Sequence, residues 1–277
     1  MTHAKTIFIT GCSTGIGYTT AIELQKRGHR VICSARKPDD VSRLQNAGFE
    51  CLLLDLADSA SIQHAVEQLI KLTDSKIDAL FNNGAFGQPG AVEDLSRETL
   101  KNQFEANFFG THELTNLLIP LMRQQGHGRI IYNSSVLGFV AMKYRGAYNA
   151  SKFALEGLAD TLRLELRGTG IHIALIEPGP IESDFRKNAF AMYQKNIDSS
   201  NSYHRETYQA MEARLQKQGP AAPFTLPATA VANKVIHALE AQKPKYRYPV
   251  TVPTHLFSWL KRFLPTAWLD KILISIE

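Results

Sequence analysis

The most informative absences in this sequence are a membrane span, a disulfide framework and a metal-binding pattern. No apolar run approaches the roughly 20 residues that a bilayer-spanning helix needs, and the N-terminus leads into an apolar segment without signal-peptide anatomy. Three cysteines in 277 residues form no disulfide framework, which favours a reducing compartment. The nine histidines show no metal-ligand spacing, so no catalytic metal is predicted. We therefore expect a cytoplasmic protein.

The sequence also lacks a broad excess of charge of one sign. Its net charge is +5, but the segment from Lys243 to Glu277 holds six Lys or Arg against two Asp or Glu. The rest of the chain is close to neutral. A nucleic-acid-binding domain usually has a basic face on its main body, so we predict no nucleic-acid partner and treat the positive charge as a property of the C-terminus.

Short apolar runs rich in Ile, Val and Leu alternate with longer segments of helical period. Most runs are apolar throughout, as expected for parallel strands buried on both faces. The alternation predicts an α/β fold of the Rossmann type, a doubly wound, seven-stranded parallel sheet with helices on both faces. The expected strands are Thr6–Thr10, Arg30–Arg36, Cys51–Asp55, Ala79–Asn83, Arg129–Ser135, His172–Pro178 and Tyr246–Val250. The expected helices lie near 15–27, 59–72, 97–123, 148–167 and 229–241.

Residues 1–250 are expected to form a single catalytic domain, because no repeat, low-complexity tract or long linker interrupts them. Within it, residues 184–227 depart from the alternation and mix aromatic residues and methionines with polar ones. They follow the sixth strand, and such sheets bind ligands beyond the ends of their strands. We interpret this segment as a substrate lid. The alternative is a surface excursion with one or two packed helices.

Residues 251–277 form a basic extension with two stretches of apolar residues at helical spacing, separated at Pro265. Two short amphipathic helices are predicted here. Their positive charge suits peripheral contact with an anionic membrane surface. They suit a cover for the substrate pocket or a dimer contact as well, so all three interpretations stay open.

A glycine-rich turn follows the first expected strand and opens the first expected helix. Its sequence, Thr-Gly-Cys-Ser-Thr-Gly-Ile-Gly, begins at Thr10. Glycines allow a tight turn and close approach of the backbone to a pyrophosphate, which then lies against the helix N-terminus. Similar turns also bind other adenosyl cofactors or no nucleotide. The predicted cofactor contacts in this turn are Gly11, Ser13, Thr14, Gly15, Ile16 and Gly17.

The end of the second expected strand indicates which nicotinamide cofactor would bind. A carboxylate there would bind the adenosine ribose hydroxyls, whereas an arginine accommodates a 2′-phosphate. The chain has Arg36 at this place and no carboxylate before Asp39. NADP(H) is therefore predicted in preference to NAD(H), and Ala35→Asp should shift the preference toward NAD(H). The alternative is that Arg36 is a solvated loop residue.

Tyr148 and Lys152 stand four residues apart at the start of a segment with strong helical period, so they share one helix face. A phenol has a reference pKa near 10, and a neighbouring ammonium favours the phenolate. This pair is common in helices and gains weight from Ser135, which ends the fifth expected strand. All three are then expected at the edge of the sheet where such folds bind ligands.

Together these features resemble the short-chain dehydrogenase/reductase family. The resemblance rests on the glycine-rich turn, Asn82-Asn83-Gly84-Ala85, Asn107, Ser135, the Tyr148/Lys152 pair and Pro178-Gly179, in order along residues 6–185. The strand–helix alternation extends it to about residue 250. The turn, Ala35-Arg36 and Glu177–Ile181 are typical of the branch with 17β-hydroxysteroid and retinol dehydrogenases and bacterial aldehyde reductases.

The resemblance implies a role for each catalytic residue. Tyr148 would act as acid–base, giving its proton to the carbonyl oxygen as hydride arrives from the nicotinamide. Lys152 would lower the pKa of the tyrosine and bind the nicotinamide ribose, and Ser135 would hold the substrate oxygen. Asn107 would position a water molecule linking Lys152 to solvent. Further cofactor contacts are implied for Asp55, Asn82, Gly84, Pro178, Gly179, Ile181 and Ser183, in addition to Tyr148 and Lys152.

One departure from the family pattern affects the cofactor site. Relatives usually have Asn-Asn-Ala-Gly after the fourth strand, while this chain has Gly84 followed by Ala85. The exchange keeps both residues small but moves the position that is free to adopt positive φ. We therefore expect altered cofactor geometry at this point and retained activity.

These observations favour an oxidoreductase that interconverts an apolar aldehyde or ketone and its alcohol with NADP(H). The alternative is a catalytically silent regulator that binds NADP(H). A methyltransferase on a similar sheet would leave the Tyr148/Lys152 pair unexplained. The long helices near 97–123 and 148–167 offer a self-complementary surface, so a homodimer or homotetramer is expected.

Overall fold

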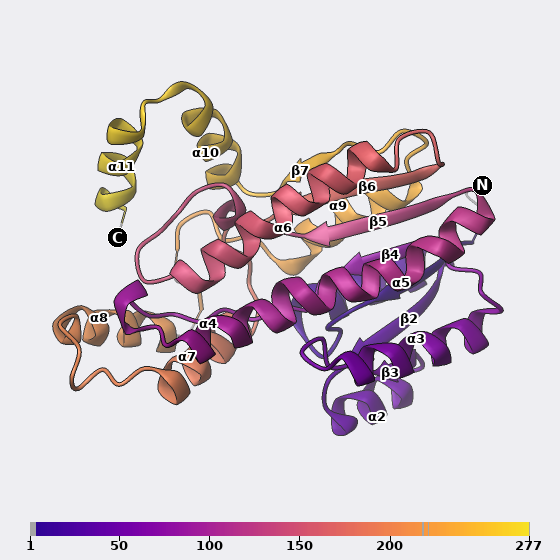
Figure 1. Cartoon of the computed structure of the whole chain (residues 1–277), viewed down its shortest axis with the longest axis horizontal. Helices are drawn as coiled ribbons and strands as arrows, with labels where there is room; N and C mark the ends of the chain where they lie inside the picture. Colours follow the sequence, from indigo (N-terminus) through magenta and orange to yellow (C-terminus); the bar gives the residue numbers. More distant parts are fainter. Residues whose placement is uncertain (1–3, 218, 221, 277) are drawn as a thin grey trace.

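The computed structural model describes residues 4–217, 219–220 and 222–276. Seven parallel strands form one sheet in the order β3-β2-β1-β4-β5-β6-β7, which confirms the predicted fold class (Figure 1). The chain crosses from β3 over the sheet to β4, so the order reverses beside β1, where such sheets bind their ligands. The strands are β1 Thr6–Ile9, β2 Arg30–Ala35, β3 Glu50–Leu53, β4 Ala79–Asn82, β5 Gly128–Asn133, β6 Ile171–Glu177 and β7 Arg247–Pro249.

Helices cover both faces of the sheet, each through its own apolar cluster. In β1, Ile7 and Ile9 join the cluster under α1 and α9, while Phe8 between them joins the opposite cluster under α3, α5 and α6. This alternation follows from the two-residue period of a strand. The helices are α1 Gly15–Lys26, α2 Pro38–Asn46, α3 Ser59–Thr73, α4 Arg97–Phe104, α5 Gly110–Gln125, α6 Gly146–Glu165 and α9 Ala228–Glu240.

Two features of this layer differ from the sequence-based expectation. The helix expected over 97–123 is divided into α4, a π-helical segment η2 (Glu105–Phe109) and α5. The close approach of α5 to the loop after β3 constrains this path, since a Cβ on Gly110 would lie 1.7 Å from the Leu56 carbonyl oxygen. Helix α2 was not predicted at all, although it has Pro38 in its first turn, followed by Asp39 and Asp40. These are ordinary signals of a helix start.

The expected lid and the C-terminal extension both contain helices. The lid holds α7 (Phe185–Asn196) and α8 (Arg205–Gln216), and the extension holds α10 (Val252–Phe263) and α11 (Thr266–Ser275). Hydrogen bonds from the Glu182 N–H to the Leu226 carbonyl and from the Leu226 N–H to the Pro180 carbonyl close the base of the lid. Both helix pairs lie beyond the carboxyl ends of the strands (Figure 1). Within the described ranges, no helix is long and apolar enough to cross a bilayer.

Candidate active site

The glycine-rich turn presents its backbone to the edge of the sheet. Helix α1 begins at Gly15, its N-cap residue Thr14 makes no side-chain capping bond, and its first turn has no acidic residue. Gly15 has a φ of +59°, and a Cβ on Gly17 would lie 2.3 Å from the Gly11 carbonyl oxygen. The turn therefore accepts only glycine at Gly17 and offers a helix N-terminus that suits a pyrophosphate.

A chain of hydrogen bonds connects this turn to the catalytic lysine. The Asn83 amide donates to the carbonyls of Thr10 (2.9 Å) and Gly11 (3.0 Å). Its own oxygen accepts from the Asn133 amide at 2.9 Å. The Asn133 carbonyl in turn accepts from the Lys152 ammonium at 2.7 Å. The sequence analysis named Asn83 only as part of a motif and did not single out Asn133, although Asn83 follows β4 and Asn133 ends β5, where ligands are expected.

Two arginines follow β2: Arg36 is exposed to solvent, and Arg43 of α2 contacts the glycine-rich turn. Arg36 is exposed, and within the described residues it makes no hydrogen bond or ion pair. Arg43 of α2 donates to the Ser13 carbonyl at 2.6 Å and pairs with Asp40 at 2.9 Å. Both guanidinium groups therefore flank the place where the adenosine ribose of a bound dinucleotide is expected. Arg43 was missed because α2 was missed.

The other expected adenosine contacts hold their own loops. The Asp55 carboxylate accepts from the Ala57 N–H at 3.0 Å, immediately after β3. The Asn82 amide donates to the Thr115 hydroxyl of α5 at 3.0 Å, and its side-chain oxygen is buried without a partner within the described residues. Asn82 is thus directed to α5, while the neighbouring Asn83 supports the turn. The contacts of both predicted residues with a cofactor stay predictions.

Gly84 serves close packing and not an unusual backbone conformation. Neither Gly84 nor Ala85 is among the residues with positive φ, which corrects the expectation that their exchange moves a position of positive φ. A Cβ on Gly84 would lie 2.9 Å from Leu56, and a Cβ on Gly11 would lie 2.8 Å from the Gly84 Cα. Gly84 is thus closely packed against Gly11, and a Cβ on Gly84 would require the Leu56 side chain to shift.

Three expected catalytic residues meet where β5 ends and α6 begins. Ser135 follows β5, and Tyr148 and Lys152 occupy successive turns of α6. The Ser135 hydroxyl hydrogen-bonds the Tyr148 phenol, and the Lys152 Nζ lies 5.7 Å from the centre of the phenol ring. Ser135 and Lys152 are buried, while Tyr148 is half-buried. The structure thus brings together the three side chains predicted from sequence.

Burial dominates the electrostatics of this group. It raises the pKa of Tyr148 to about 12, against the lowering effects of the Ser135 hydrogen bond and of Arg145. It lowers the pKa of Lys152 to about 8, against the opposing charge of Glu156. The phenol is therefore protonated at neutral pH and ready to act as a proton donor. The expected lowering of the Tyr148 pKa by Lys152 stays a prediction.

A cluster of three carboxylates lies near Lys152, with Glu156 and Glu177 buried and Asp160 partly exposed. Glu156 and Asp160 continue the face of α6 that bears Lys152, and Glu177 ends β6. All three carboxylates pair with the single guanidinium of Arg247 on β7. Burial, with the charge of Glu156, raises the pKa of Glu177 to about 7. Sequence reasoning did not single out this cluster, because its members come from three separate elements.

Asn107 joins the loop after β4 to helix α6. Its amide nitrogen donates to the Phe86 carbonyl at 2.9 Å and to the Ser151 hydroxyl at 3.3 Å, and its oxygen accepts from the Phe86 N–H. It lies in the π-helical segment η2, the kind of helix bulge that is frequent at functional sites. Asn107 is thus fixed next to Ser151, the neighbour of Lys152, and its expected role in positioning a water molecule stays a prediction.

The segment after β6 approaches the glycine-rich turn. A Cβ on Gly15 would lie 3.0 Å from the Ser183 Cβ, and a Cβ on Gly179 would lie 2.1 Å from the Thr251 hydroxyl. The Pro178 carbonyl accepts from the Val136 N–H at 2.8 Å, and Ile181 forms the bridge at the base of the lid. A cleft of about 460 Å³ opens here, lined by Gly15, Glu182, Ser183, Asp184, Arg186 and Gly219. The two predicted cofactor-binding segments therefore border one cleft.

Apolar side chains of α7 and α10 lie near Tyr148. The Phe185 ring of α7 packs edge-on against the Tyr148 ring, with centroids 5.3 Å apart. A Cβ on Gly87 would lie 2.8 Å from Phe185. Tyr148 also packs against a buried apolar cluster formed by Val136, Leu137 and Val140 of the segment after β5 and Phe257 of α10. Other side chains packed against the same cluster are Phe139, Met142, Leu260, Leu269, Ile272 and Leu273. The Tyr148 ring therefore has apolar neighbours from three parts of the chain.

Polar anchors fix the lid to the loop after β4. The Tyr208 hydroxyl accepts from the Ala91 N–H at 2.9 Å and donates to Asp94, which also accepts from the Ser202 hydroxyl at 2.6 Å. His204 pairs with Glu93. The lid predicted from sequence is thus a packed element joined to the body on the substrate side.

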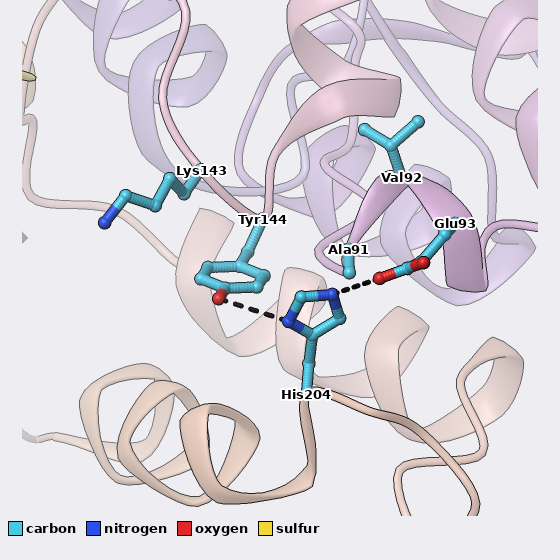
Figure 2. A pocket seen from close by; sticks show the side chains of 6 residues that line it. All are labelled: Ala91, Val92, Glu93, Lys143, Tyr144 and His204. Carbon is cyan, nitrogen blue, oxygen red and sulfur yellow. Dashed lines mark hydrogen bonds and ion pairs between the residues drawn. The ribbon is translucent and has the colours of Figure 1, made fainter. Parts of the chain in front are cut away.

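A second cleft of about 480 Å³ lies beside these anchors and contains none of the predicted catalytic residues. Figure 2 shows the imidazole of His204 between Glu93 and the Tyr144 hydroxyl, whose oxygen lies 3.4 Å from the imidazole Nδ1. This cleft and the cleft beside Gly15 share no lining residue.

Comparison with known proteins identifies the family. The pattern of the family described as short chain dehydrogenase matches residues 5–194. Over 269 residues, covering 97% of this chain and 94% of the relative, the chain is 44% identical to the uncharacterized oxidoreductase YbbO of Escherichia coli K12. It is 32% identical to an NADPH-dependent 3-dehydrocapnine reductase of Ornithobacterium rhinotracheale, over 95% and 94% of the two chains. It is 30% identical to human 17-beta-hydroxysteroid dehydrogenase type 1, over 94% and 78%.

Solved structures show the same fold. A short-chain dehydrogenase from Streptomyces avermitilis aligns with a TM-score of 0.78 and 26% identity, over 98% of this chain and 95% of that one. Actinorhodin polyketide ketoreductase, solved with NADPH, aligns with a TM-score of 0.72 and 25% identity, over 89% and 95%. A Burkholderia phymatum short-chain dehydrogenase solved with NAD aligns with a TM-score of 0.78 at 22% identity, over 92% and 91%. Such neighbours therefore hold either nicotinamide cofactor.

Proposed function

We propose that this chain, which belongs to the short-chain dehydrogenase family, interconverts an apolar aldehyde or ketone and its alcohol with NADP(H). The family match and the relatives make it an oxidoreductase that acts on CH–OH or C=O groups. The observation that carries the proposal is the geometry of the Tyr148 phenol, which is hydrogen-bonded to Ser135 and has the Nζ of the buried Lys152 5.7 Å from the centre of its ring.

These residues suit a proton transfer coupled to the reduction of a carbonyl. A bound nicotinamide would supply the hydride. Ser135 would hold the carbonyl oxygen beside Tyr148, which donates its proton to that oxygen as negative charge develops there. Lys152, held by the Asn133 carbonyl, keeps a positive charge near the phenol and stabilises the phenolate that remains. The oxidative direction reverses these steps.

The cradle for the dinucleotide fits the pyrophosphate and favours a 2′-phosphate. Gly17 leaves room that a side chain would fill, at the N-terminus of α1. Arg36 is an exposed cation without a partner in the described chain, and Arg43 lies against Ser13. No carboxylate follows β2 before Asp39. The name of the 3-dehydrocapnine reductase, which specifies NADPH, also supports NADP(H) over NAD(H).

The apolar cluster around Tyr148 supports an apolar substrate. Phe185 packs against the Tyr148 ring, and leucines of the C-terminal helices pack against the same buried apolar cluster as Tyr148. Such a lining favours hydrocarbon next to the reacting carbonyl. Two relatives carry the names of enzymes that act on a hydroxysteroid and on retinol, both apolar molecules.

Assembly and compartment are proposed on separate grounds. Large apolar side chains are exposed along η2, α5 and α6, among them Phe109, Leu117 and Leu164. They support an isologous contact between copies, hence a homodimer or homotetramer.

Cys12, Cys33 and Cys51 are buried free thiols, which supports the proposal of a reducing, cytoplasmic compartment.

The test of the proposed function is turnover by wild type and Tyr148→Phe with a panel of aldehydes, ketosteroids and retinal. We expect NADPH oxidation with an apolar carbonyl, reduced by roughly a hundredfold to ten-thousandfold in Tyr148→Phe, with NADPH affinity kept. Tyr18→Phe, a partly buried tyrosine of α1, is the matched control and should keep full activity. Tight NADPH binding without turnover on any carbonyl would favour the silent regulator instead.

Cofactor preference has its own test. Ala35→Asp places a carboxylate at the end of β2, where it repels a 2′-phosphate and binds ribose hydroxyls. The ratio of kcat/KM for NADPH over NADH should fall in this variant and in Arg36→Ala. Asp39→Asn, a little further along the chain, is the control. An unchanged ratio in both variants would contradict the assignment of Arg36.

A further inference from the structure

The C-terminal helices α10 and α11 have an inner apolar face that contacts the site. On it, Phe257 is buried and Leu260, Leu269 and Leu273 are partly buried, packed in the cluster that contains Tyr148. This face agrees with one of the interpretations left open by the sequence, a cover over the substrate pocket. It does not account for the opposite face of the same helices.

The outer face of α10 is an exposed apolar stripe. Its members stand at i, i+4, i+7 and i+11, which places them on one line along the helix. Their exposed fractions are 57%, 52%, 65% and 65%. The rings of Trp259 and Phe263 stack on each other with centroids 5.5 Å apart. The stripe consists of Val252, Leu256, Trp259 and Phe263.

Helix α11 extends this apolar surface. Trp268 is 65% exposed, so both tryptophans of the chain lie on this helix pair and face solvent. Tryptophan is enriched where protein meets the interface of a membrane, because its ring is apolar and its N–H is polar. An exposed apolar surface of this kind marks an interaction site.

Basic side chains outnumber acidic ones on the two helices that carry this apolar surface. Over α10 and α11, Lys261, Arg262 and Lys271 are opposed by one acidic residue, Asp270. The Lys261 ammonium lies over the Phe153 ring of α6, 4.8 Å from its centre, and Arg262 and Lys271 are exposed. The outer surface of this helix pair is therefore both apolar and basic.

We propose that the outer face of α10–α11 docks on an anionic lipid surface. An amphipathic helix with an aromatic apolar face and basic flanks binds such a surface through buried apolar area and attraction to lipid headgroups. A second copy of the chain is a poorer occupant. An isologous contact would set the same basic flanks against each other, whereas anionic headgroups neutralise them.

Docking there would bring the lipid next to the catalytic site. Helices α10 and α11 project beyond the carboxyl ends of the strands (Figure 1), and their inner face packs in the cluster around Tyr148. An apolar carbonyl compound dissolved in the lipid would then reach the site along this helix pair. This second step rests on the proposed function, whereas docking itself does not.

The test is flotation of the full-length chain with vesicles. Wild type should float with vesicles of phosphatidylcholine and phosphatidylglycerol, and should stay in solution with phosphatidylcholine alone or at high salt. Trp259→Gln combined with Phe263→Gln should abolish flotation without changing Tm. The matched control is Tyr203→Gln combined with Phe224→Gln, two side chains that are 93% and 61% exposed elsewhere on the surface. This control should float like wild type.

Charge is tested separately by Arg262→Gln combined with Lys271→Gln. Each lost cation should weaken vesicle binding about fivefold, while Lys71→Gln combined with Lys101→Gln, on α3 and α4, should not weaken it.

Reduction of a water-soluble aldehyde without vesicles is measured on every variant. Wild type that reduces the aldehyde but does not float overturns docking and leaves the proposed function intact. Wild type that floats but reduces no carbonyl leaves docking intact and overturns the proposed function. Loss of a dimer in Trp259→Gln/Phe263→Gln without flotation of wild type would assign the stripe to a second copy.

Discussion

Two sides of the site are held in place by different interactions. One side faces the glycine-rich turn, and the other faces the lid and the C-terminal helices. On the first side, glycines with no room for a side chain and a chain of hydrogen bonds from Gly11 to Lys152 set the positions of the backbone. On the second side, aromatic and aliphatic packing around Tyr148 and Tyr208 does so, with a few polar anchors. The difference teaches that the side suited to the cofactor tolerates few substitutions, because they meet backbone atoms. The side suited to the substrate tolerates more, because its side chains can repack.

The largest effect is expected from Gly17→Ala. The added Cβ would lie 2.3 Å from the Gly11 carbonyl oxygen, a backbone atom that cannot move without displacing the turn. We expect roughly a hundredfold weaker NADPH binding, equivalent to about 3 kcal/mol, measured by titration of cofactor fluorescence.

Gly157→Ala is the control for this change. Gly157 lies in the interior of α6, and a Cβ there would meet nothing within 4 Å. The same substitution should raise the free energy of unfolding by about 1 kcal/mol and leave NADPH binding unchanged. Equal effects of the two substitutions on cofactor affinity would remove the contrast between the two sides.

A second test concerns the pH dependence of carbonyl reduction. The pKa of Lys152 is about 8, so its ammonium loses the proton as pH rises through that value. The rate should therefore fall above about pH 8, by up to about tenfold per pH unit. Because the charge of Glu156 raises the pKa of Lys152, Glu156→Gln should move this fall to lower pH.

Asp160→Asn is the control for the pH profile. Asp160 lies one turn beyond Glu156 on α6 and also pairs with Arg247, but it is not a source of the Lys152 shift. Its removal should leave the midpoint in place. A midpoint that moves equally in both variants would show that the whole carboxylate cluster acts through Arg247 and not through Glu156.

The contrast between the two sides also explains what could be predicted from the sequence. The sheet, the turn at Gly11–Gly17 and the Ser135–Tyr148–Lys152 group follow from local patterns, because the turn and Ser135 directly follow strands and Tyr148 and Lys152 stand four residues apart on one helix. The carboxylate cluster around Arg247 and the anchor between Tyr208 and Asp94 join residues far apart in the chain. No local pattern records such pairs. Helix α2 carried ordinary start signals that were overlooked.

A third test addresses the substrate side. Tyr208 is fully buried, and Tyr208→Phe removes the hydroxyl that accepts from the Ala91 N–H and donates to Asp94. We expect a loss of about 1–3 kcal/mol in the free energy of unfolding and a KM for the carbonyl raised by up to about tenfold. NADPH affinity should stay constant. Tyr203→Phe, where the side chain is 93% exposed, should change none of these. Weaker NADPH binding in Tyr208→Phe would mean that the two sides are coupled.

A fourth test is Glu177→Gln, which examines how the carboxylate cluster contributes to stability. Burial, with the charge of Glu156, raises the pKa of Glu177 from 4.5 to about 7, so the folded chain binds this proton more tightly than the unfolded chain. Folding stability contributed by this group therefore falls as pH rises from 4.5 to 7. Removing the carboxyl should make the variant gain about 1–3 kcal/mol relative to wild type across that window, measured by urea unfolding. Arg247 keeps Glu156 and Asp160 as partners in the variant. A constant difference from wild type across the window would mean that Arg247 already compensates the buried charge of Glu177 in full. The cluster would then stabilise this edge of the site, as the glycine-rich turn stabilises the opposite edge.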